Sequence, residues 1–219
     1  MPRFRLALSL SLALIPAAVP GVAVAQQVHF GDGWTEQRFS LFSGNEFSLN
    51  GDTLSVRSDD TVSLLWTRLP ESMWAKRAAT WDWAVDRSVP ATDLTRKGGD
   101  DRNLSIYFLF LPEAAARDGR NRGVRALLDN PDVRVLMYVW GGAHSRGEIL
   151  PTPYLGARGR TVVQRGAGTG SVAERVDLAR DFERAFGGRP ENLVGIAVSS
   201  DSDDTGTEVV ARISRLRID

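Results

Sequence analysis

Hydrophobic and polar residues alternate along much of the chain, and this period of two is typical of β-strands with one buried face. In residues 78–86 (AATWDWAVD), Trp81, Trp83 and Val85 share one face. In residues 103–111 (NLSIYFLFL), apolar side chains occupy every even-numbered position from 104 to 110. Residues 133–140 (VRVLMYVW) are almost continuously apolar, which predicts a central strand covered on both sides. Further strands are expected at 53–57, 61–69, 160–164, 170–176, 193–199 and 207–218.

Helical periodicity is scarce. Residues 177–186 (DLARDFERAF) have Leu178, Phe182 and Phe186 on one face, followed by a glycine pair that predicts the helix end. A turn or two of helix is expected around 123–129, in a segment (113–123) that otherwise has the composition of an exposed insertion. Regular alternation of strands and helices is missing, which argues against a doubly wound fold. The pattern predicts a mainly β protein, a jelly-roll-like antiparallel β-sandwich with one short helix near the C-terminal third.

The N-terminus has the layout of a secretory signal. Arg3 and Arg5 precede an apolar stretch that is interrupted by prolines, and small residues end it at 23–25. We therefore expect residues 1–25 to be a cleaved signal peptide and residues 26–219 to be a single β-sandwich domain. The expected location is the periplasm or the exterior, with no membrane span left after cleavage.

Composition removes several classes of function. The chain has 27 basic and 27 acidic residues, and the expected signal contains two of the arginines and no acid, so the mature net charge is −2. This balance argues against nucleic-acid binding, which needs a basic surface. Cysteine is absent, which excludes thiol nucleophiles and cysteine metal sites. The only histidines are His29 and His144, so a multi-histidine zinc site is excluded as well.

An acidic cluster, SSDSDDTG at 199–206, follows the apolar run 193–198. Asp201, Asp203 and Thr205 match the D-x-D-x-T of aspartate-nucleophile phosphotransferases, but too little chain follows to build the α/β core that such enzymes need. An EF-hand loop is excluded because position twelve would be Arg212 rather than glutamate. The cluster is best interpreted as a polar turn into the last strand, with a site there as the alternative.

A second acidic segment, KGGDDRN at 97–103, opens the strand that contains the even-numbered apolar positions. Asp100 and Asp101 point to opposite faces at a strand start, so only one of them is expected to point inward. Arg102 is placed to neutralise an inward carboxylate through a bidentate pair.

The order of these segments resembles a bacterial family of exported proteins known as domain of unknown function 3047. The resemblance rests on WDWAVD, KGGDDRNLSIYFLF, LMYVWG, Pro153-Tyr154, RDFERAFG and GIAVSSDSDDTG, and covers about Leu64 to Ile218. It implies a fold and a site without an established activity. The matching positions are Trp81, Trp83, Asp100, Asp101, Tyr107, Phe110, Tyr138, Trp140, Gly141, Asp181, Phe186, Gly187, Asp201, Asp203, Asp204 and Thr205. Where the family often has basic residues, this chain has Asp82, Ala84, Asn103 and Ser105, which argues against a shared anionic ligand.

The first functional hypothesis is a module that binds a glycan or another small molecule, with aromatic rings as platforms and carboxylates as hydrogen-bond partners. Trp81 and Trp83 are expected in the core. Trp140 is expected either in the core or at the site, and Trp74 is expected at the lip of the site. Other aromatic candidates are Trp66, Tyr138 and Tyr154. The predicted ligand-binding residues are Asp100, Asp101, Arg102, Tyr107, Trp140, His144, Asp201, Asp203, Asp204 and Thr205.

Two alternatives remain open. A glycosidase-like hydrolase would use Asp101 and Asp203 as its two carboxyl groups. A Ser-His-Asp site is disfavoured, because His144 and Ser145 are adjacent and no G-x-S-x-G turn is present. A purely structural or interaction protein would instead hold calcium between the acidic turns, through Asp101, Asp201 and Asp203. Calcium is the one cofactor that the acidic segments suggest.

Overall fold

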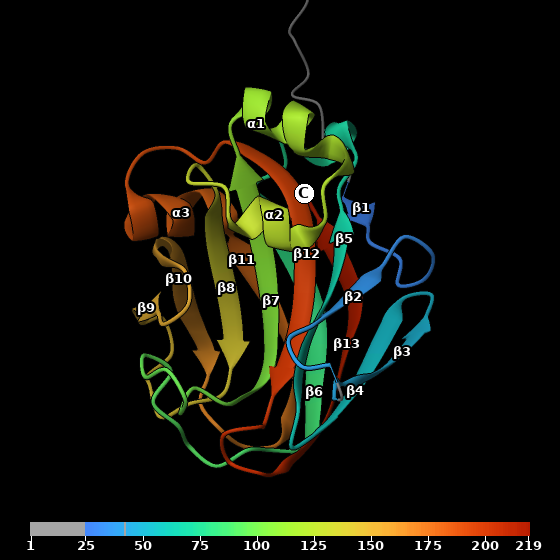
Figure 1. The fold of residues 1–219 in the computed structure, drawn as a ribbon, viewed down its shortest axis with the longest axis vertical. Helices are drawn as coiled ribbons and strands as arrows, with labels where there is room; N and C mark the ends of the chain where they lie inside the picture. The colour runs from blue at the N-terminus through green and yellow to red at the C-terminus, as the bar shows by residue number, and fades with distance from the viewer. Residues whose placement is uncertain (1–24, 42) are drawn as a thin grey trace, which may run out of the picture.

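In the computed structural model, residues 25–41 and 43–219 are described, and they form two β-sheets packed face to face (Figure 1). The six-stranded sheet has the order β11 (Gly170–Asp177), β6 (Ala78–Arg87), β13 (Glu208–Ile218), β4 (Thr53–Asp59) and β3 (Glu46–Asn50), with β1 (Gln26–Gln27) paired to β13. The seven-stranded sheet has the order β2 (Thr35–Arg38), β5 (Val62–Arg68), β12 (Asn192–Asp201), β7 (Arg102–Leu111), β8 (Arg134–Trp140), β10 (Gly156–Arg165) and β9 (Ile149–Thr152). The predicted jelly-roll-like β-sandwich is confirmed, whereas residues 1–24 of the predicted signal peptide lie outside the described part.

The core between the sheets contains the aromatic residues that the alternation placed together. Trp81 and Trp83 on β6 are buried and meet edge to face, with ring centroids 5.4 Å apart. Trp81 also packs against Phe108 and Tyr138 of the opposite sheet, at 6.3 and 5.8 Å. Such edge and tilted contacts are the preferred geometry of aromatic rings. The expectation that both tryptophans belong to the core is confirmed.

Strands β7 and β8 have the positions in the sheet that their patterns predict. The even-numbered residues of β7, from Leu104 to Phe110, face the core between the sheets. Strand β8 lies between β7 and β10 and is buried on both faces. Its residue Tyr138 points into the core, whereas Val135 and Met137 join smaller apolar clusters on the outer face.

One strand pair departs from the predicted antiparallel arrangement. Strands β8 and β10 are parallel, with Arg160 opposite Leu136. After β8 the chain runs back along β9 at the sheet edge, and β10 then fills the place between β9 and β8. The chain reverses direction between β8 and β9 and again between β9 and β10. Strand β10 therefore runs in the same direction as β8. Four short strands, β1, β2, β3 and β9, were not predicted, because segments of two to five mostly polar or half-exposed residues have little periodicity.

The helices are more numerous than predicted. The expected helix is α3 (Leu178–Phe186); Asp177 accepts a hydrogen bond from the Arg180 amide at its start, and it ends at Gly187. The turn or two of helix expected around 123–129 is α2 (Val124–Leu128). The segment 113–123, interpreted as an exposed insertion, instead forms α1 (Glu113–Asp118) and the 3-10 turn η2 (Gly119–Asn121). These elements bury Ala116, Val124 and Leu127 over one end of the outer face of the seven-stranded sheet (Figure 1). A further 3-10 turn, η1 (Glu71–Met73), follows β5.

Among the described residues, no helix combines the length and the apolar character needed to cross a membrane.

Candidate functional site

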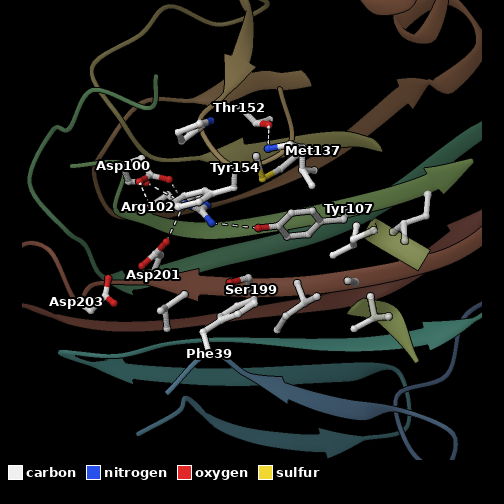
Figure 2. A pocket seen from close by; sticks show the side chains of 18 of the residues that line it. Phe39, Asp100, Arg102, Tyr107, Met137, Thr152, Tyr154, Ser199, Asp201 and Asp203 are labelled. Carbon is white, nitrogen blue, oxygen red and sulfur yellow. Dashed lines mark hydrogen bonds and ion pairs between the residues drawn. The ribbon is translucent and has the colours of Figure 1, made fainter. Parts of the chain in front are cut away.

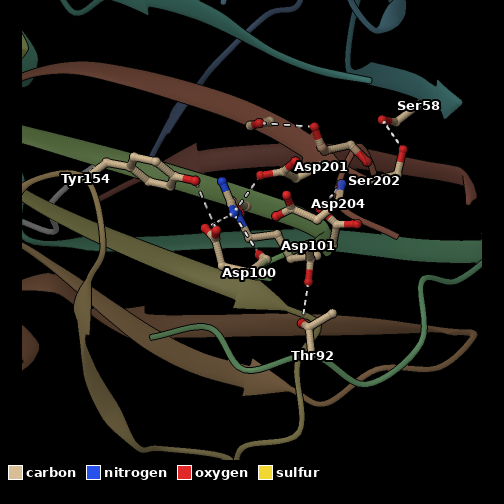
Figure 3. A network of polar contacts seen from close by, with 12 residues as sticks. Ser58, Thr92, Asp100, Asp101, Tyr154, Asp201, Ser202 and Asp204 are labelled. Carbon is tan, nitrogen blue, oxygen red and sulfur yellow. Dashed lines mark hydrogen bonds and ion pairs between the residues drawn. The ribbon is translucent and has the colours of Figure 1, made fainter. Parts of the chain in front are cut away.

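The two acidic segments lie side by side at one end of the seven-stranded sheet. Strand β12 ends at Asp201, strand β7 begins at Arg102, and these two residues are register partners in the antiparallel pair. The turn after Asp201 and the segment before Arg102 therefore meet, as Figure 3 shows. This adjacency follows from antiparallel pairing, because the end of one strand and the start of its neighbour lie at the same edge.

Asp101 fastens one acidic segment to the other. Its Oδ2 accepts hydrogen bonds from the Thr205 amide at 2.7 Å and the Thr205 hydroxyl at 2.6 Å, and its Oδ1 accepts from the Asp204 amide at 3.3 Å. Its side chain is fully buried. A carboxylate that accepts two backbone amides is a strong local anchor. Asp101 therefore holds the turn, and this position does not suit the ligand contact or the catalytic role expected of it.

Arg102 is the centre of the site. Its Nη1 lies 3.0 Å from Asp100 Oδ2 and 2.9 Å from Asp201 Oδ2, while its Nε donates to Ser105 Oγ at 2.8 Å. Its Nη2 donates to the Tyr107 hydroxyl at 3.1 Å. Because the guanidinium is buried and all its nitrogens have partners, its position is fixed before any ligand arrives. Arg102 pairs with carboxylates as predicted, but not through the bidentate pair that was expected, because Nη1 alone contacts both Asp100 and Asp201.

Gly141 allows the chain to pass close to Arg102. A β-carbon on Gly141 would lie 2.8 Å from the Arg102 Cα, closer than real side chains come, and its φ is +156°. The glycine that follows Trp140 therefore lets β8 end directly beside the start of β7.

Asp100 connects the buried arginine to the surface. Its Oδ1 accepts a hydrogen bond from the Tyr154 hydroxyl at 3.2 Å, and the Tyr154 ring lies 5.5 Å from Lys97 Nζ. Burial and the neighbouring Asp100 carboxylate raise the pKa of Tyr154 to about 12, so its hydroxyl keeps its proton and acts as a donor. The Tyr154 side chain is nevertheless 57% exposed, which leaves its ring available to a ligand.

Asp201 is an unusual carboxyl group. It is buried, and burial raises its pKa to about 8, with the Asp203 and Asp101 carboxylates acting in the same direction and Arg102 opposing them. Desolvation outweighs the single guanidinium because that cation is shared with Asp100. At neutral pH Asp201 therefore holds a proton for most of the time, which makes it a hydrogen-bond donor as well as an acceptor.

Asp101, Asp201 and Asp203 form the compact carboxyl cluster expected of a calcium site. One oxygen from each of the three lies within 4.8 Å of the others. Oxygen ligands of this kind suit calcium. The Arg102 guanidinium, however, already lies 2.9 Å from Asp201, and both oxygens of Asp101 accept hydrogen bonds from the turn. The calcium site stays a prediction, and its donor set is partly occupied by protein groups.

A pocket of about 400 Å³ opens beside this network on the outer face of the seven-stranded sheet (Figure 2). Its floor is formed by β5, β12, β7 and β8, and its walls by α2 and by residues 152–155. Of the predicted site residues it contains Asp100, Arg102, Tyr107, Asp201, Asp203 and Asp204. Lining residues that the sequence did not suggest are Phe39, Val62, Leu64, Leu109, Val124, Leu128, Met137, Thr152, Pro153, Leu155, Ala197 and Ser199; the predicted platform Tyr154 completes the lining.

Four predicted site residues lie away from the pocket. Trp140 is buried in the core against Trp83, with centroids 5.6 Å apart. Thr205 supports Asp101, as described above. His144 lies in the loop after β8 and contacts Asp93, with its Nε2 3.3 Å from Asp93 Oδ1. Asp101 itself is beneath the turn and does not line the pocket.

The expectation for Trp74 is wrong. It does not form a lip, since its side chain is buried in the apolar cluster under α1, where its Nε1 donates to the Leu69 carbonyl at 3.2 Å. Tyr138 is likewise a core residue, whose hydroxyl donates to Asp181 Oδ2 at 3.0 Å. The neighbours of Trp74 in the sequence are polar, which led to the expectation that it is exposed. Its neighbours in the folded protein are apolar.

The comparisons with known proteins bear on the fold and the family. Residues 32–217 match the family described as "Protein of unknown function (DUF3047)". The protein belongs to this family. The resemblance inferred from the sequence motifs is thereby confirmed, and the match begins earlier in the chain than those motifs do. A comparison with curated proteins found no match.

Solved structures that align with this chain include a xyloglucanase domain and a xylanase. The xyloglucanase domain of NopAA from Sinorhizobium fredii, in complex with cellobiose, aligns over 90% of this chain and 98% of its own, with 9% identity and a TM-score of 0.45. The family 11 xylanase from Neocallimastix patriciarum aligns over 89% and 94%, with 12% identity and a TM-score of 0.43. At sequence identities this low, the similarity concerns the arrangement of strands alone.

Proposed function

We propose that this protein is a binding module for a carbohydrate-like ligand, which it takes into the pocket on the outer face of the seven-stranded sheet. The observation that carries the proposal is the fixed polar end of that pocket, where Asp100, Arg102 and Asp201 are held together beside Tyr154. Pockets of a few hundred cubic ångströms with a mostly apolar lining and a few fixed polar groups are typical of small-ligand sites.

The polar end suits hydroxyl groups better than charged ligands. Carboxylates accept from hydroxyls and the protonated Asp201 donates to them, so a sugar edge finds both kinds of partner. Four of the lining residues are acidic and one, Arg102, is basic. This excess of carboxyl groups disfavours an anionic ligand by like-charge repulsion.

Two exposed aromatic rings flank the opening. Tyr154 and Phe39 are each 57% exposed, and they lie on opposite sides of the pocket in Figure 2. Large apolar rings that remain exposed at the rim of a pocket are characteristic of ligand contacts. The apolar face of a sugar ring can stack on such side chains while its hydroxyls reach the polar end.

Thermal unfolding and calorimetric titration against a panel of soluble glycans test this proposal. A ligand that binds the folded state raises the unfolding temperature with its concentration. We expect at least one glycan to do so, and Tyr154→Ala and Phe39→Ala each to weaken binding. Leu41→Ala is the matched control, because Leu41 is 90% exposed and does not line the pocket. Equal loss in all three variants, or binding of no glycan, would contradict the proposal.

A carboxylate-dependent hydrolase is the second candidate function, and the raised pKa of Asp201 favours it. A general acid must keep its proton at the working pH, and burial gives Asp201 this property. Asp203, whose carboxyl group belongs to the same cluster, would be the second carboxyl group in place of the buried Asp101. In this mechanism Asp201 protonates the leaving oxygen while Asp203 attacks the sugar carbon, because carboxyl oxygens within 4.8 Å leave no room for a water between them.

Aryl glycosides distinguish hydrolysis from binding. If the pocket hydrolyses glycosides, Asp201→Asn abolishes release of the aryl group while ligand binding persists, because asparagine keeps the size and hydrogen bonds of the protonated acid. Absence of turnover by the wild-type protein on every glycoside that it binds would leave the binding module as the function.

A further inference from the structure

The pocket has two chemically different halves. One half is the polar end around Arg102. The other half, toward α2, is aliphatic and is lined by Leu64, Leu109, Val124, Leu128, Met137 and Leu155. Side chains from both halves appear as sticks in Figure 2, where they follow one another along the direction of the strands.

The aliphatic half is recessed, with a buried floor and partly exposed walls. Its floor residues Leu109 and Leu64 are only 2% and 4% exposed, although they line the pocket. Its walls come from different parts of the chain, Leu128 at the end of α2 and Leu155 in the turn between β9 and β10, and both are partly exposed. Helix α2 ends at Leu128, so the outer face of the sheet beyond it is left uncovered.

A sugar alone does not suit this half. Hydroxyl groups placed against leucine and methionine side chains lose their hydrogen bonds to water and gain none, which is costly. A hydrocarbon group there instead removes apolar surface from water on both sides. The two halves together therefore match a ligand with two unlike ends.

We infer that the ligand is amphipathic, with a hydroxyl-rich head at the polar end and an alkyl or aryl group in the aliphatic half. This inference rests on the proposed function for the head of the ligand and adds the apolar group. The ligand class is thus a glycoside with an apolar aglycone or a glycolipid-like molecule, rather than a free polysaccharide.

Alkyl glycosides of increasing chain length, kept below the concentration at which they form micelles, test the inference. The probes are methyl, butyl and hexyl glucosides, with the corresponding maltosides and xylosides to vary the head. Each methylene that becomes fully buried is expected to tighten binding about fourfold, so methyl to butyl corresponds to a gain of several tens of fold at full burial. Calorimetric titration measures the dissociation constants.

Two variants test whether the alkyl chain of the ligand binds in the aliphatic half. Leu128→Gln and Leu155→Gln place polar groups in the aliphatic half, and each is expected to remove most of the dependence on chain length, measured as the ratio of the methyl to the hexyl glycoside dissociation constant within the same variant. Ala126→Gln is the control, because Ala126 lies on the exposed side of the same helix and outside the pocket. Unfolding curves of each variant establish that it is folded before titration.

The outcomes separate the inference from the function on which it rests. Glycosides that bind with no dependence on chain length would overturn the inference and leave the binding module intact. A hexyl chain on an ethylene glycol head that binds as tightly as hexyl glycosides would retain the apolar site but overturn the carbohydrate head. If neither glycosides nor the glycol bind, both are wrong.

Discussion

The two faces of the seven-stranded sheet are built from the same strands and serve different purposes. On β7, Phe108 points inward and packs against Trp81 and Tyr138, with no exposed surface. Its neighbour Tyr107 points outward, accepts a hydrogen bond from Arg102 Nη2, and lines the pocket. The inner face is covered by the second sheet and by α3, whose Phe182 packs on Phe110 with ring centroids 5.2 Å apart. The outer face is covered only in part, by α1 and α2. Partial cover of an apolar sheet face is what creates the pocket.

The largest expected effect contrasts these neighbouring residues. Phe108→Ala removes a fully buried ring and should lower the free energy of unfolding by about 3–5 kcal/mol. Tyr107→Ala removes a half-buried ring and one hydrogen bond, so it should cost about 1–2 kcal/mol while weakening ligand binding. Chemical denaturation measures both. Equal losses would show that the outer face is as fully packed as the core.

Removal of the Arg102 guanidinium is expected to lower the free energy of unfolding nearly as much as truncation of a core residue does. Arg102→Ala leaves the buried Asp100 carboxylate without its cation and the Asp201 carboxyl group without a hydrogen-bond donor, and breaking a buried pair in this way costs about 3 kcal/mol. The control is Arg212→Ala, whose pair with Asp86 lies on the exposed surface of the other sheet and should matter little. Denaturation of the two variants in parallel makes the comparison, and similar small losses would contradict a fixed polar end.

A smaller and more local effect is expected at Asp101. Asp101→Asn keeps the side-chain shape but weakens the hydrogen bonds that hold the turn at 204–205, at a cost of about 1–2 kcal/mol. Amide hydrogen exchange should speed up at Thr205 and Asp204 more than in the core strand β6. Unchanged protection at these two amides would mean that Asp101 does not anchor the turn.

Asp201 should make stability depend on pH. Its folded pKa is raised to about 8, whereas the unfolded chain ionises near the ordinary value of about 4. The folded state therefore retains a proton that the unfolded state loses, and the stabilisation present below about pH 4 is lost as the pH rises toward 8. Asp201→Asn should flatten the stability curve over this interval relative to wild type. Parallel curves for the two proteins would contradict the raised pKa.

The smallest expected effect is that of calcium. A divalent ion bound to Asp201 would lie close to the Arg102 guanidinium, and the two positive charges would repel each other. At 1 mM calcium we expect a gain in unfolding free energy of less than about 0.5 kcal/mol, the value for a dissociation constant near 1 mM. A larger gain that is specific to calcium and lost in Asp203→Ala would establish a metal site.

The sequence predicted the inner face better than the outer face. Alternation on β6 and β7 identified Trp81, Trp83 and Phe108 because a sheet face packed against a second sheet has a strict period of two. The acidic ends of β7 and β12 were also identifiable, because each lies next to a clear strand.

The aliphatic half of the pocket could not be predicted in this way. Leu64, Leu109 and Leu155 come from three distant segments, and their apolar character is typical of any buried strand or turn. Whether such residues face a core or an empty space depends on how far α2 covers the sheet, and this depends on tertiary packing. Trp74 and Trp140 were misjudged or left open for the same reason, since local sequence does not reveal what packs over a ring.

A two-dimensional amide spectrum titrated with hexyl glucoside tests the central claim most directly, because it reports where on the molecule a ligand binds. We expect saturable shifts at residues of the pocket, in particular at Arg102, Tyr154 and Asp201 for the sugar head and at Leu128 for the alkyl chain, with little change at Trp83 in the core. Shifts that do not saturate, or that are concentrated on the six-stranded sheet, would contradict a ligand site on the outer face.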